Sequence, residues 1–366
     1  MSNPYVGILV NDSLFAGIPL GNTQYEAIRF YEDAGKHFGL TPCYFRIQDV
    51  HLKTMKVYAY VQEGHQFKRK WSDLPKVIHN RAIYLDAASA RVLQKWTEQG
   101  VTIFNHWNRY SKMRIHTLLM KNEQIRPHLP CTFPATVENV KVMMDTYDSL
   151  IIKPTNSSIG RGVMKLEKQG KAWKLIYPIN LKLTNRHWRT LRFRHQLPLL
   201  LRRRILKSNY LIQQCLPLAT VNGSPFDLRI SVQRGPSGDW GVTGIVAKIA
   251  SRQHFLTNVA QGGKVASLAD ILNNHYPQLD REAVCLQLTN FAILVAQHLS
   301  TELPNLADLG LDIAMTSDGY PLFIECNSKD QRYSFREAEM QDCWKATYFN
   351  PMGYAKFIIS GGTPPC

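Results

Sequence analysis

The chain has 366 residues, of which 45% are hydrophobic and 20% charged, and its net charge is +16. This length allows two or three domains or lobes. No apolar run approaches the roughly 18 residues of a membrane span, and we see no secretory signal at the N-terminus. The seven cysteines are scattered without a C-x-x-C pair, which argues against a disulfide framework or a zinc site. We therefore expect a cytoplasmic protein with an anionic partner; no zinc-finger, RNP or helix-turn-helix signature predicts sequence-specific nucleic-acid binding.

The first 108 residues have the pattern of an α/β domain. An apolar strand at 5–10 and a loop at 17–21 precede a helix from about Gln24 to Phe38, with Thr23 as its cap. The later elements expected here are a strand at 43–47, a hairpin at 57–71, a strand at 75–81, a helix at 87–99 and a strand at 101–105. This order predicts a parallel sheet, with Asn80 and Arg81 at a strand end facing a cleft.

A candidate phosphate-binding loop follows an apolar strand that ends at Lys153. The loop contains Ser157, Ser158, Gly160, Arg161 and Gly162. Small residues let backbone N–H groups approach phosphate oxygens closely, although the loop lacks the Walker pattern. The alternative is an ordinary Ser/Gly hairpin turn.

Two strand-length apolar runs near the C-terminus flank a turn at Ser317-Asp318-Gly319. A hairpin would place Asp312 beside Glu325, and period-two alternation puts Asn327 on the same face as Glu325. These oxygen ligands suit Mg²⁺, and Mn²⁺ is also compatible. The alternative is a hairpin whose acids face solvent.

Two further motifs lie between these segments. Asp227 and Arg229 share one face of the first strand of a long hairpin over 226–251, where Arg229 could hold a phosphate or merely form a same-face ion pair. Downstream, the loop with Asn258, Gly262, Gly263 and Lys264 could present amides and an ammonium to an anion, or could be only a turn.

The segment 182–207 is rich in Lys and Arg, contains no acid, and interleaves Trp188 and Phe193 with the charges. One hypothesis is a basic arm that docks an acidic peptide or a cell-envelope polymer. The alternative is a solvated basic helix with a leucine face packed on the domain.

Taken in order, these motifs resemble the ATP-grasp superfamily: Lys112 before a helix, IIKP-x5-GRGV, YLIQQ, FDLR, N-x3-GGK, Asp312 and E-x-N. The segments PKVIHNR, FLTNVAQGGKV and IECNSKDQRYSFR resemble its YheC/YheD-like, endospore coat-associated branch. The resemblance implies an α/β and α+β fold, in which two α+β lobes clasp ATP behind a small N-terminal α/β domain. The boundaries expected on this basis are 1–108, 109–216, 217–352 and a tail over 353–366.

The resemblance also implies residue roles. ATP would contact Lys112, Lys153, the lid residues Ser157, Ser158, Gly160, Arg161 and Gly162, and the hinge residues Gln213, Gln214, Cys215 and Leu216. Mg²⁺ would bind Asp312, Glu325 and Asn327. Arg229 and Lys248 would act in catalysis, and Asp227, Asn258, Gly262, Gly263 and Lys264 would bind substrate.

The implied activity is ATP-dependent ligation, in which a carboxylate becomes an acyl-phosphate and an amine or thiol then displaces phosphate. The acceptor would be an acidic peptide or an envelope or spore-coat component. Two alternatives remain open: an ATP-dependent phosphotransferase, which would use the same ATP geometry, and a non-catalytic scaffold of the spore coat that binds ATP or polyanions.

Overall fold

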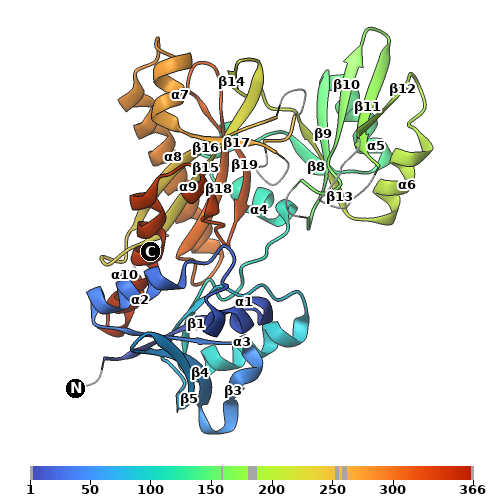
Figure 1. Ribbon diagram of the computed structural model, residues 1–366. Helices are drawn as coiled ribbons and strands as arrows, with labels where there is room; N and C mark the ends of the chain where they lie inside the picture. Colours follow the sequence, from blue (N-terminus) through green and yellow to red (C-terminus); the bar gives the residue numbers. More distant parts are fainter. Residues whose placement is uncertain (1–2, 158–159, 180–187, 252–254, 258–261, 364–366) are drawn as a thin grey trace.

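The computed structural model describes residues 3–157, 160–179, 188–251, 255–257 and 262–363. Within these ranges the chain forms an N-terminal domain, a middle lobe and a C-terminal lobe, each built on its own sheet (Figure 1). The middle lobe projects beside the C-terminal lobe, and the N-terminal domain lies beneath the C-terminal lobe in this view.

The N-terminal sheet has the order β3-β4-β2-β1-β6-β7, with β5 paired to β4. β1 is parallel to β2 and β6, and β6 is parallel to β7, as the α/β pattern predicts. The elements are β1 (Tyr5–Leu9), α1 (Asp12–Gly17), η1 (Ile18–Leu20), α2 (Ile28–Phe38), β2 (Thr41–Phe45), η2 (Ile47–Asp49), β3 (Val50–His51), η3 (Leu52–Thr54), β4 (Lys56–Glu63), β5 (Gln66–Asp73), β6 (Val77–Asn80), α3 (Ala87–Glu98) and β7 (Thr102–Phe104).

One element of this domain was not predicted and one boundary is wrong. The short helix α1, before the expected loop, buries Leu14 and Phe15 and is too short to show a helical period. α2 begins at Ile28 rather than near Gln24, because the Thr23 hydroxyl donates to the backbone oxygen of Glu26 and closes a turn instead of capping a helix.

The middle lobe is an antiparallel six-stranded sheet in the order β12-β11-β10-β9-β13-β8. Its elements are β8 (Thr132–Pro134), α5 (Val137–Thr146), β9 (Ser149–Pro154), β10 (Met164–Gln169), β11 (Ala172–Pro178), β12 (Trp188–Phe193), α6 (Leu199–Lys207) and β13 (Tyr210–Gln214). α5 and α6 cover one face, where Met143 and Leu201 join Leu150 and Ile152 in one core. The alternate strand residues therefore point to the opposite face of the sheet.

The C-terminal lobe has the sheet order β17-β16-β15-β18-β19, with β14 paired to β15. The elements associated with this lobe are α4 (Lys112–Leu119), η4 (Arg126–His128), β14 (Thr220–Val221), β15 (Ser224–Arg234), β16 (Trp240–Ile249), β17 (Lys264–Ser267), α7 (Leu268–His275), α8 (Arg281–Glu302), β18 (Asp308–Met315), β19 (Pro321–Asn327) and α9 (Tyr333–Glu337). α4 was expected with the middle lobe, but its Ile115 and Leu119 lie in the core of the C-terminal lobe.

α8 is the one helix in the described ranges that is long and apolar enough to cross a membrane by length and composition. Its buried residues, such as Leu288 and Val295, pack in the core formed with β15 and β18. We read α8 as the core helix of this lobe.

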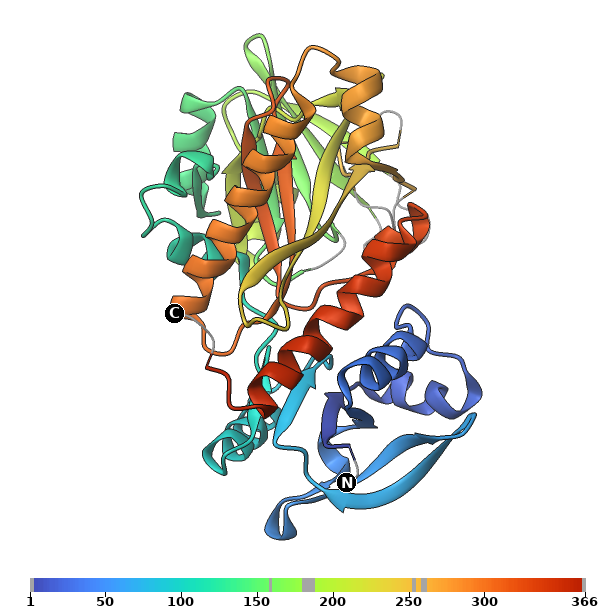
Figure 2. The same ribbon diagram turned by 90° about the vertical axis from the view of Figure 1, so that its left-hand side faces the viewer.

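α10 (Gln341–Ile359) lies between the C-terminal lobe and the N-terminal domain, as Figure 2 shows. Its Tyr348 packs against Phe30 and Tyr31 of α2. The chain from 353 was expected to be a tail, but it is helical as far as Ile359 because buried residues such as Tyr354 continue the packed face.

Candidate active site

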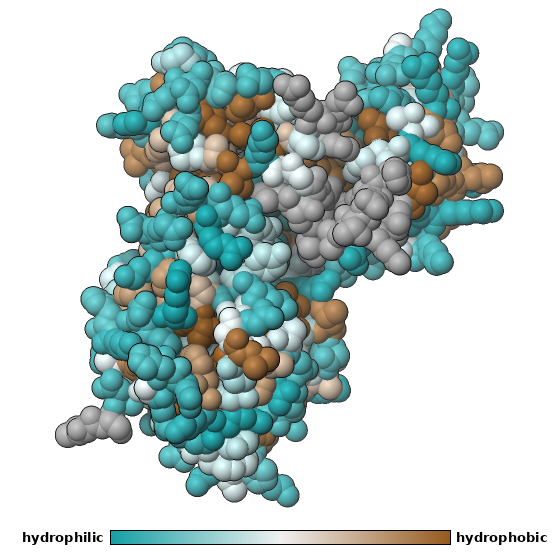
Figure 3. Space-filling model, viewed as in Figure 1, coloured by the Kyte–Doolittle hydropathy of each residue, from teal (hydrophilic) through white to brown (hydrophobic). Residues whose placement is uncertain are grey.

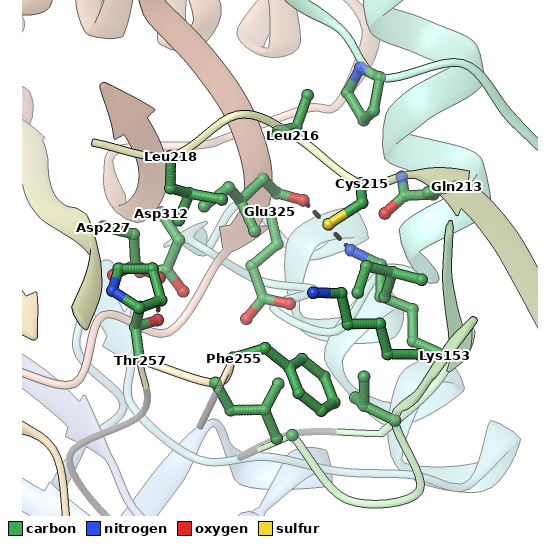
Figure 4. A pocket seen from close by; sticks show the side chains of 18 of the residues that line it. Lys153, Gln213, Cys215, Leu216, Leu218, Asp227, Phe255, Thr257, Asp312 and Glu325 are labelled. Carbon is green, nitrogen blue, oxygen red and sulfur yellow. Dashed lines mark hydrogen bonds between the residues drawn. The ribbon is translucent and has the colours of Figure 1, made fainter. Parts of the chain in front are cut away.

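A cavity of about 400 Å³ lies between the middle and C-terminal lobes, lined by β9, β10 and β13 on one side and by β15, β16, β18 and β19 on the other (Figure 4). The predicted site residues that line it are Lys112, Lys153, Ser157, Gly160, Gln213, Gln214, Cys215, Leu216, Asp227, Lys248, Asp312 and Glu325. Residues more than 200 positions apart in the sequence therefore meet in one cavity.

The carboxylates at one end of the cavity come from the β18–β19 hairpin. Asp312 is directly opposite Glu325 in the register, as the alternation predicted, and the Asn327 amide nitrogen lies 3.5 Å from a Glu325 carboxylate oxygen. A bulge follows this pair, so that Asp312 faces Glu325 while Ile313 faces Phe323. The extra residue, Ile324, lines the cavity and offers its carbonyl oxygen there.

Asp312 is the centre of a buried charge cluster. The Arg229 Nε donates to Asp312 Oδ1 over 2.8 Å, and Lys248 Nζ lies 2.8 Å from the same oxygen. Lys248 also pairs with Asp227 at 2.9 Å, and the Thr257 hydroxyl donates to Asp227. Burial alone would raise the pKa of Asp312, but Arg229 and Lys248 hold it below its usual range.

Lys153 is the last residue but one of β9, lies on the cavity face and is 7% exposed. Burial lowers its pKa to about 8, and the charge of Lys112 acts in the same direction. Its Nζ has one hydrogen bond in the described structure, to the Ile324 carbonyl oxygen at 3.4 Å. Lys153 is thus a buried cation with few partners, which favours binding of an anion.

Lys112 is held at the start of α4, where the Ser111 side chain caps the helix. Its Nζ donates to the Ser157 carbonyl oxygen over 2.6 Å and lies 3.3 Å from a Glu325 carboxylate oxygen. One ammonium therefore connects the candidate phosphate loop with the carboxylate end of the cavity.

The end of β13 and the residues after it line another part of the cavity. β13 ends at Gln214, and the chain continues along the cavity through Cys215, Leu216 and Leu218 (Figure 4). The Gln213 side chain donates to the Thr132 hydroxyl over 2.9 Å, which fixes β13 against β8. Apolar side chains beside backbone polar groups suit a planar base.

The family model for YheC/D-like ATP-grasp proteins matches residues 100–358. The chain belongs to this family. It is 24% identical over 321 residues to the endospore coat-associated protein YheD of Bacillus subtilis (strain 168), covering 83% of this chain and 67% of YheD. It is also 24% identical to YheC of the same organism, over 88% of this chain and 89% of YheC.

The fold is that of ATP-grasp ligases. The structure resembles the Chryseobacterium gregarium RiPP-associated ATP-grasp ligase, which was solved with ADP and a leader and core peptide, at a TM-score of 0.51 and 11% identity. The match covers 99% of this chain and 98% of that one. The ATP-grasp fold expected from the motif order is confirmed.

For the remaining predicted site residues the outcome is mixed. Arg229 reaches the site through Asp312, although it does not itself line the cavity. Six others also lie outside the lining: Arg161, Gly162, Gly262, Gly263, Lys264, which begins β17, and Asn327. Ser158 and Asn258 lie outside the described residues.

The backbone conformation of Gly162 and the space around it both favour glycine at this position. Its φ is +77°, and a Cβ there would come within 3.0 Å of both Pro154 and the Tyr210 hydroxyl. The turn that follows the candidate phosphate loop therefore closes tightly over the end of β9.

Sequence reasoning missed several cavity residues. Lys165, Phe255 and Thr257 line the cavity, and Lys165 Nζ lies 5.7 Å from the centre of the Phe255 ring. Alternation along β10 places Lys165 on the cavity face, so a correct strand orientation would have found it. Phe255 has no periodic signal of this kind because it lies outside regular secondary structure.

The prediction that Asn80 and Arg81 face the cleft is wrong. Both are 2% exposed. Asn80 donates to the backbone oxygens of Asn105 and His106, and Arg81 pairs with Glu26. These strand-end residues satisfy buried polar groups inside the N-terminal domain and at its border instead of presenting a binding surface.

Within the described ranges, no three His, Cys, Asp or Glu side chains are grouped to hold a metal ion. The cross-strand pair of Asp312 and Glu325, with the Asn327 amide beside it, nevertheless supplies the carboxylate and amide oxygens that Mg²⁺ prefers. Because Mg²⁺ usually keeps waters and substrate phosphates as further ligands, this donor set fits the ion.

Proposed function

We propose that the protein is an ATP- and Mg²⁺-dependent ligase that joins a carboxylate to an amine or thiol. The observation that carries the proposal is the cavity between the lobes, in which buried Lys153 and Lys248 face the carboxylates Asp312 and Glu325. A nucleoside triphosphate with its metal ion requires anion-binding and cation-binding groups close together.

In this proposal the nucleotide lies along the cavity. Cys215 and Leu216 contact the base, and the ammonium groups of Lys112 and Lys153 contact the phosphates. The loop with Ser157 and Gly160 covers them and excludes water, which protects a reactive acyl-phosphate. Asp312, Glu325 and Asn327 would hold Mg²⁺, which supplies charge neutralisation for phosphoryl transfer.

The chemistry follows from where charge develops. A substrate carboxylate oxygen attacks the γ-phosphorus of ATP, the bond to the β-phosphate oxygen breaks, and ADP leaves. An amine or thiol then attacks the acyl carbon, loses its proton, and displaces inorganic phosphate. In this proposal Lys248, which lines the cavity, stabilises the negative charge on the transferring group, and Arg229 acts from behind Asp312, to which both side chains are bonded.

The test is turnover with Mg²⁺ and ATP in the presence of pools of amino acids and acidic peptides. We expect ADP release that depends on a pool, together with a new amide or thioester and free phosphate. Glu325→Gln is expected to abolish this turnover, whereas Glu123→Gln, at an exposed acid outside the cavity lining, serves as the matched control. A phosphorylated acceptor in place of the amide would show a phosphotransferase, and absence of nucleotide binding would overturn the proposal.

We extend to this chain an association with the spore coat, because both curated relatives are named endospore coat-associated proteins. The acceptor in this proposal is a coat or envelope component, and an acidic peptide is the class that the charge of the chain favours.

A further inference from the structure

Most of the excess positive charge of the chain is concentrated in one part of the middle lobe. Residues 160–214 contain fourteen Lys and Arg side chains and a single acid, Glu167, which is a net charge of +13 out of +16 for the whole chain. The nucleotide chemistry described above uses little of this charge. A surplus of this size on one lobe favours an anionic partner that is larger than ATP.

Part of this charge lies at a sheet edge. β12 is the terminal strand of its sheet in the described structure and pairs only with β11. Arg189 and Arg192 on β12, and Arg194 just after it, are exposed and form no ion pair with another described residue. Figure 1 places β12 and α6 at the outer side of the lobe, and Figure 3 shows hydrophilic side chains projecting from this rim.

The register connects this edge to the cavity. Arg192 is opposite Lys174 on β11, and Thr190 is opposite Ile176, which in turn is opposite Lys165 on β10. Lys165 lines the cavity. These residues share the face of the sheet that is not covered by α5 and α6. Glu167 lies on this face too and pairs with Lys165 at 2.7 Å and Lys174 at 3.6 Å. Arg192, Lys174 and Lys165 against one acid still make a net positive track from the edge strand to the candidate active site.

Arg189 and Arg192 are an odd number of residues apart, so they point to opposite faces of the sheet. A strand added at this edge would likewise direct its side chains alternately to the two faces, and on each face the nearest β12 side chains include an arginine. The edge therefore favours a segment that is acidic at successive positions rather than one that alternates acidic and apolar residues.

We propose that the outer edge of β12 is a docking site for an extended, acidic polypeptide, which adds one strand to the sheet and is directed along the net positive track toward the cavity. Backbone hydrogen bonds to the edge give affinity and Arg–carboxylate pairs give selectivity. The identity of this polypeptide as the acceptor rests on the proposed ligase function; the docking itself does not.

The experiment measures fluorescence anisotropy of a labelled oligoglutamate peptide with the nucleotide-free full chain. We expect saturable binding that weakens by more than about tenfold in the triple variant Arg189→Glu, Arg192→Glu, Arg194→Glu, because each reversal replaces attraction by repulsion. The matched control is Lys53→Glu, Lys56→Glu, Lys76→Glu, three exposed lysines of the N-terminal domain with the same change in net charge. An equal loss in both variants would overturn a site at β12.

Two comparisons separate strand addition from charge alone. An oligoglutamate with alternate backbone nitrogens methylated keeps its charge but loses hydrogen-bond donors, and we expect it to bind at least about fivefold more weakly. Equal binding of the methylated peptide would refute the added strand, as would equally tight, competing binding of single-stranded RNA or anionic vesicles. Exposed arginines on an edge strand can also serve to prevent self-association of the edges. If oligoglutamate does not bind, the arginines of β12 have only this protective role, and the proposal is overturned.

Binding of ATP is measured on the same preparation. Oligoglutamate binding without any ATP binding would refute the proposed ligase and support the docking site. ATP turnover without oligoglutamate binding would refute the docking site and support the proposed ligase.

Discussion

Lys153 should stabilise bound nucleotide at the expense of the stability of the free protein. We predict that Lys153→Met raises the free energy of unfolding of the nucleotide-free protein at neutral pH while it weakens ATP binding. The reason is that the ammonium is buried with one long hydrogen bond to Ile324, whereas methionine has a similar stem and no charge.

The magnitude follows from the pKa of Lys153. Its value falls from 10.5 to about 8, which corresponds to about 3 kcal/mol. Because the folded form binds this proton less tightly than the unfolded form, the full penalty applies below about pH 8 and disappears as the pH rises above about 10.5. At neutral pH, Lys153→Met is therefore expected to gain up to about 3 kcal/mol.

Urea denaturation of the nucleotide-free protein at about pH 7 and about pH 10 tests this prediction, with wild type and variant compared at each pH so that other titrations cancel. Lys141→Met, at an exposed position on α5, is the control and should change stability by less than about 0.5 kcal/mol. A Lys153→Met variant that is less stable than wild type at about pH 7 would refute the reasoning, since it would show that the buried ammonium is well compensated.

Two other predictions concern stability away from the site. Asp308→Asn should lower the free energy of unfolding by about 3 kcal/mol, because Asp308 is fully buried and accepts hydrogen bonds from Arg332 at 2.7 Å and Arg81 at 3.3 Å. Chemical denaturation measures this loss, with the exposed Asp145→Asn variant as the control. A loss of less than about 1 kcal/mol would contradict the prediction. Burial raises the pKa of Glu32 from 4.5 to about 7, so the favourable contribution of Glu32 to stability is present below about pH 4.5 and lost as the pH rises through about 7. Glu32→Gln should therefore be more stable than wild type by up to about 3 kcal/mol at about pH 8, and about as stable as wild type near pH 4.5. A stability difference that does not change with pH would refute this prediction.

The sequence predicted the parts of the site that follow from strand alternation. The pairing of Asp312 with Glu325 needed only a turn at Gly319 and a period of two. The position of Lys153 on the cavity face followed in the same way from the end of an apolar strand. Such features are local, and the sequence expresses them directly.

The features that were missed depend on contacts between distant segments. α4 was assigned to the neighbouring lobe because its helical pattern does not show which core receives Ile115. The buried role of Arg81 depends on Glu26 and Asp308, which lie 55 and 227 residues away. A strand-end arginine has the same sequence pattern whether it binds a ligand or closes a domain interface, so only the fold separates the two.

The pairing of the site carboxylates in the structure leads to a last prediction. Glu325 is paired with Lys112, and Asp312 with Lys248 and Arg229. The cations that would serve the phosphates are thus held by the carboxylates that would serve Mg²⁺. We predict that each group exchanges its partner when metal and nucleotide bind together, so that the charge within the cavity stays balanced.

Glu325→Gln removes one half of this exchange. Lys112 is then released, so we expect ATP to bind the variant more tightly than wild type in the presence of EDTA, by about threefold for a partly exposed pair worth under 1 kcal/mol. With Mg²⁺ the order should reverse, because the metal loses a ligand. Titration of a fluorescent ATP analogue with and without Mg²⁺ measures both affinities. Weaker binding of the variant in EDTA would show that Glu325 does not restrain Lys112, and the exchange of partners would then have to be abandoned.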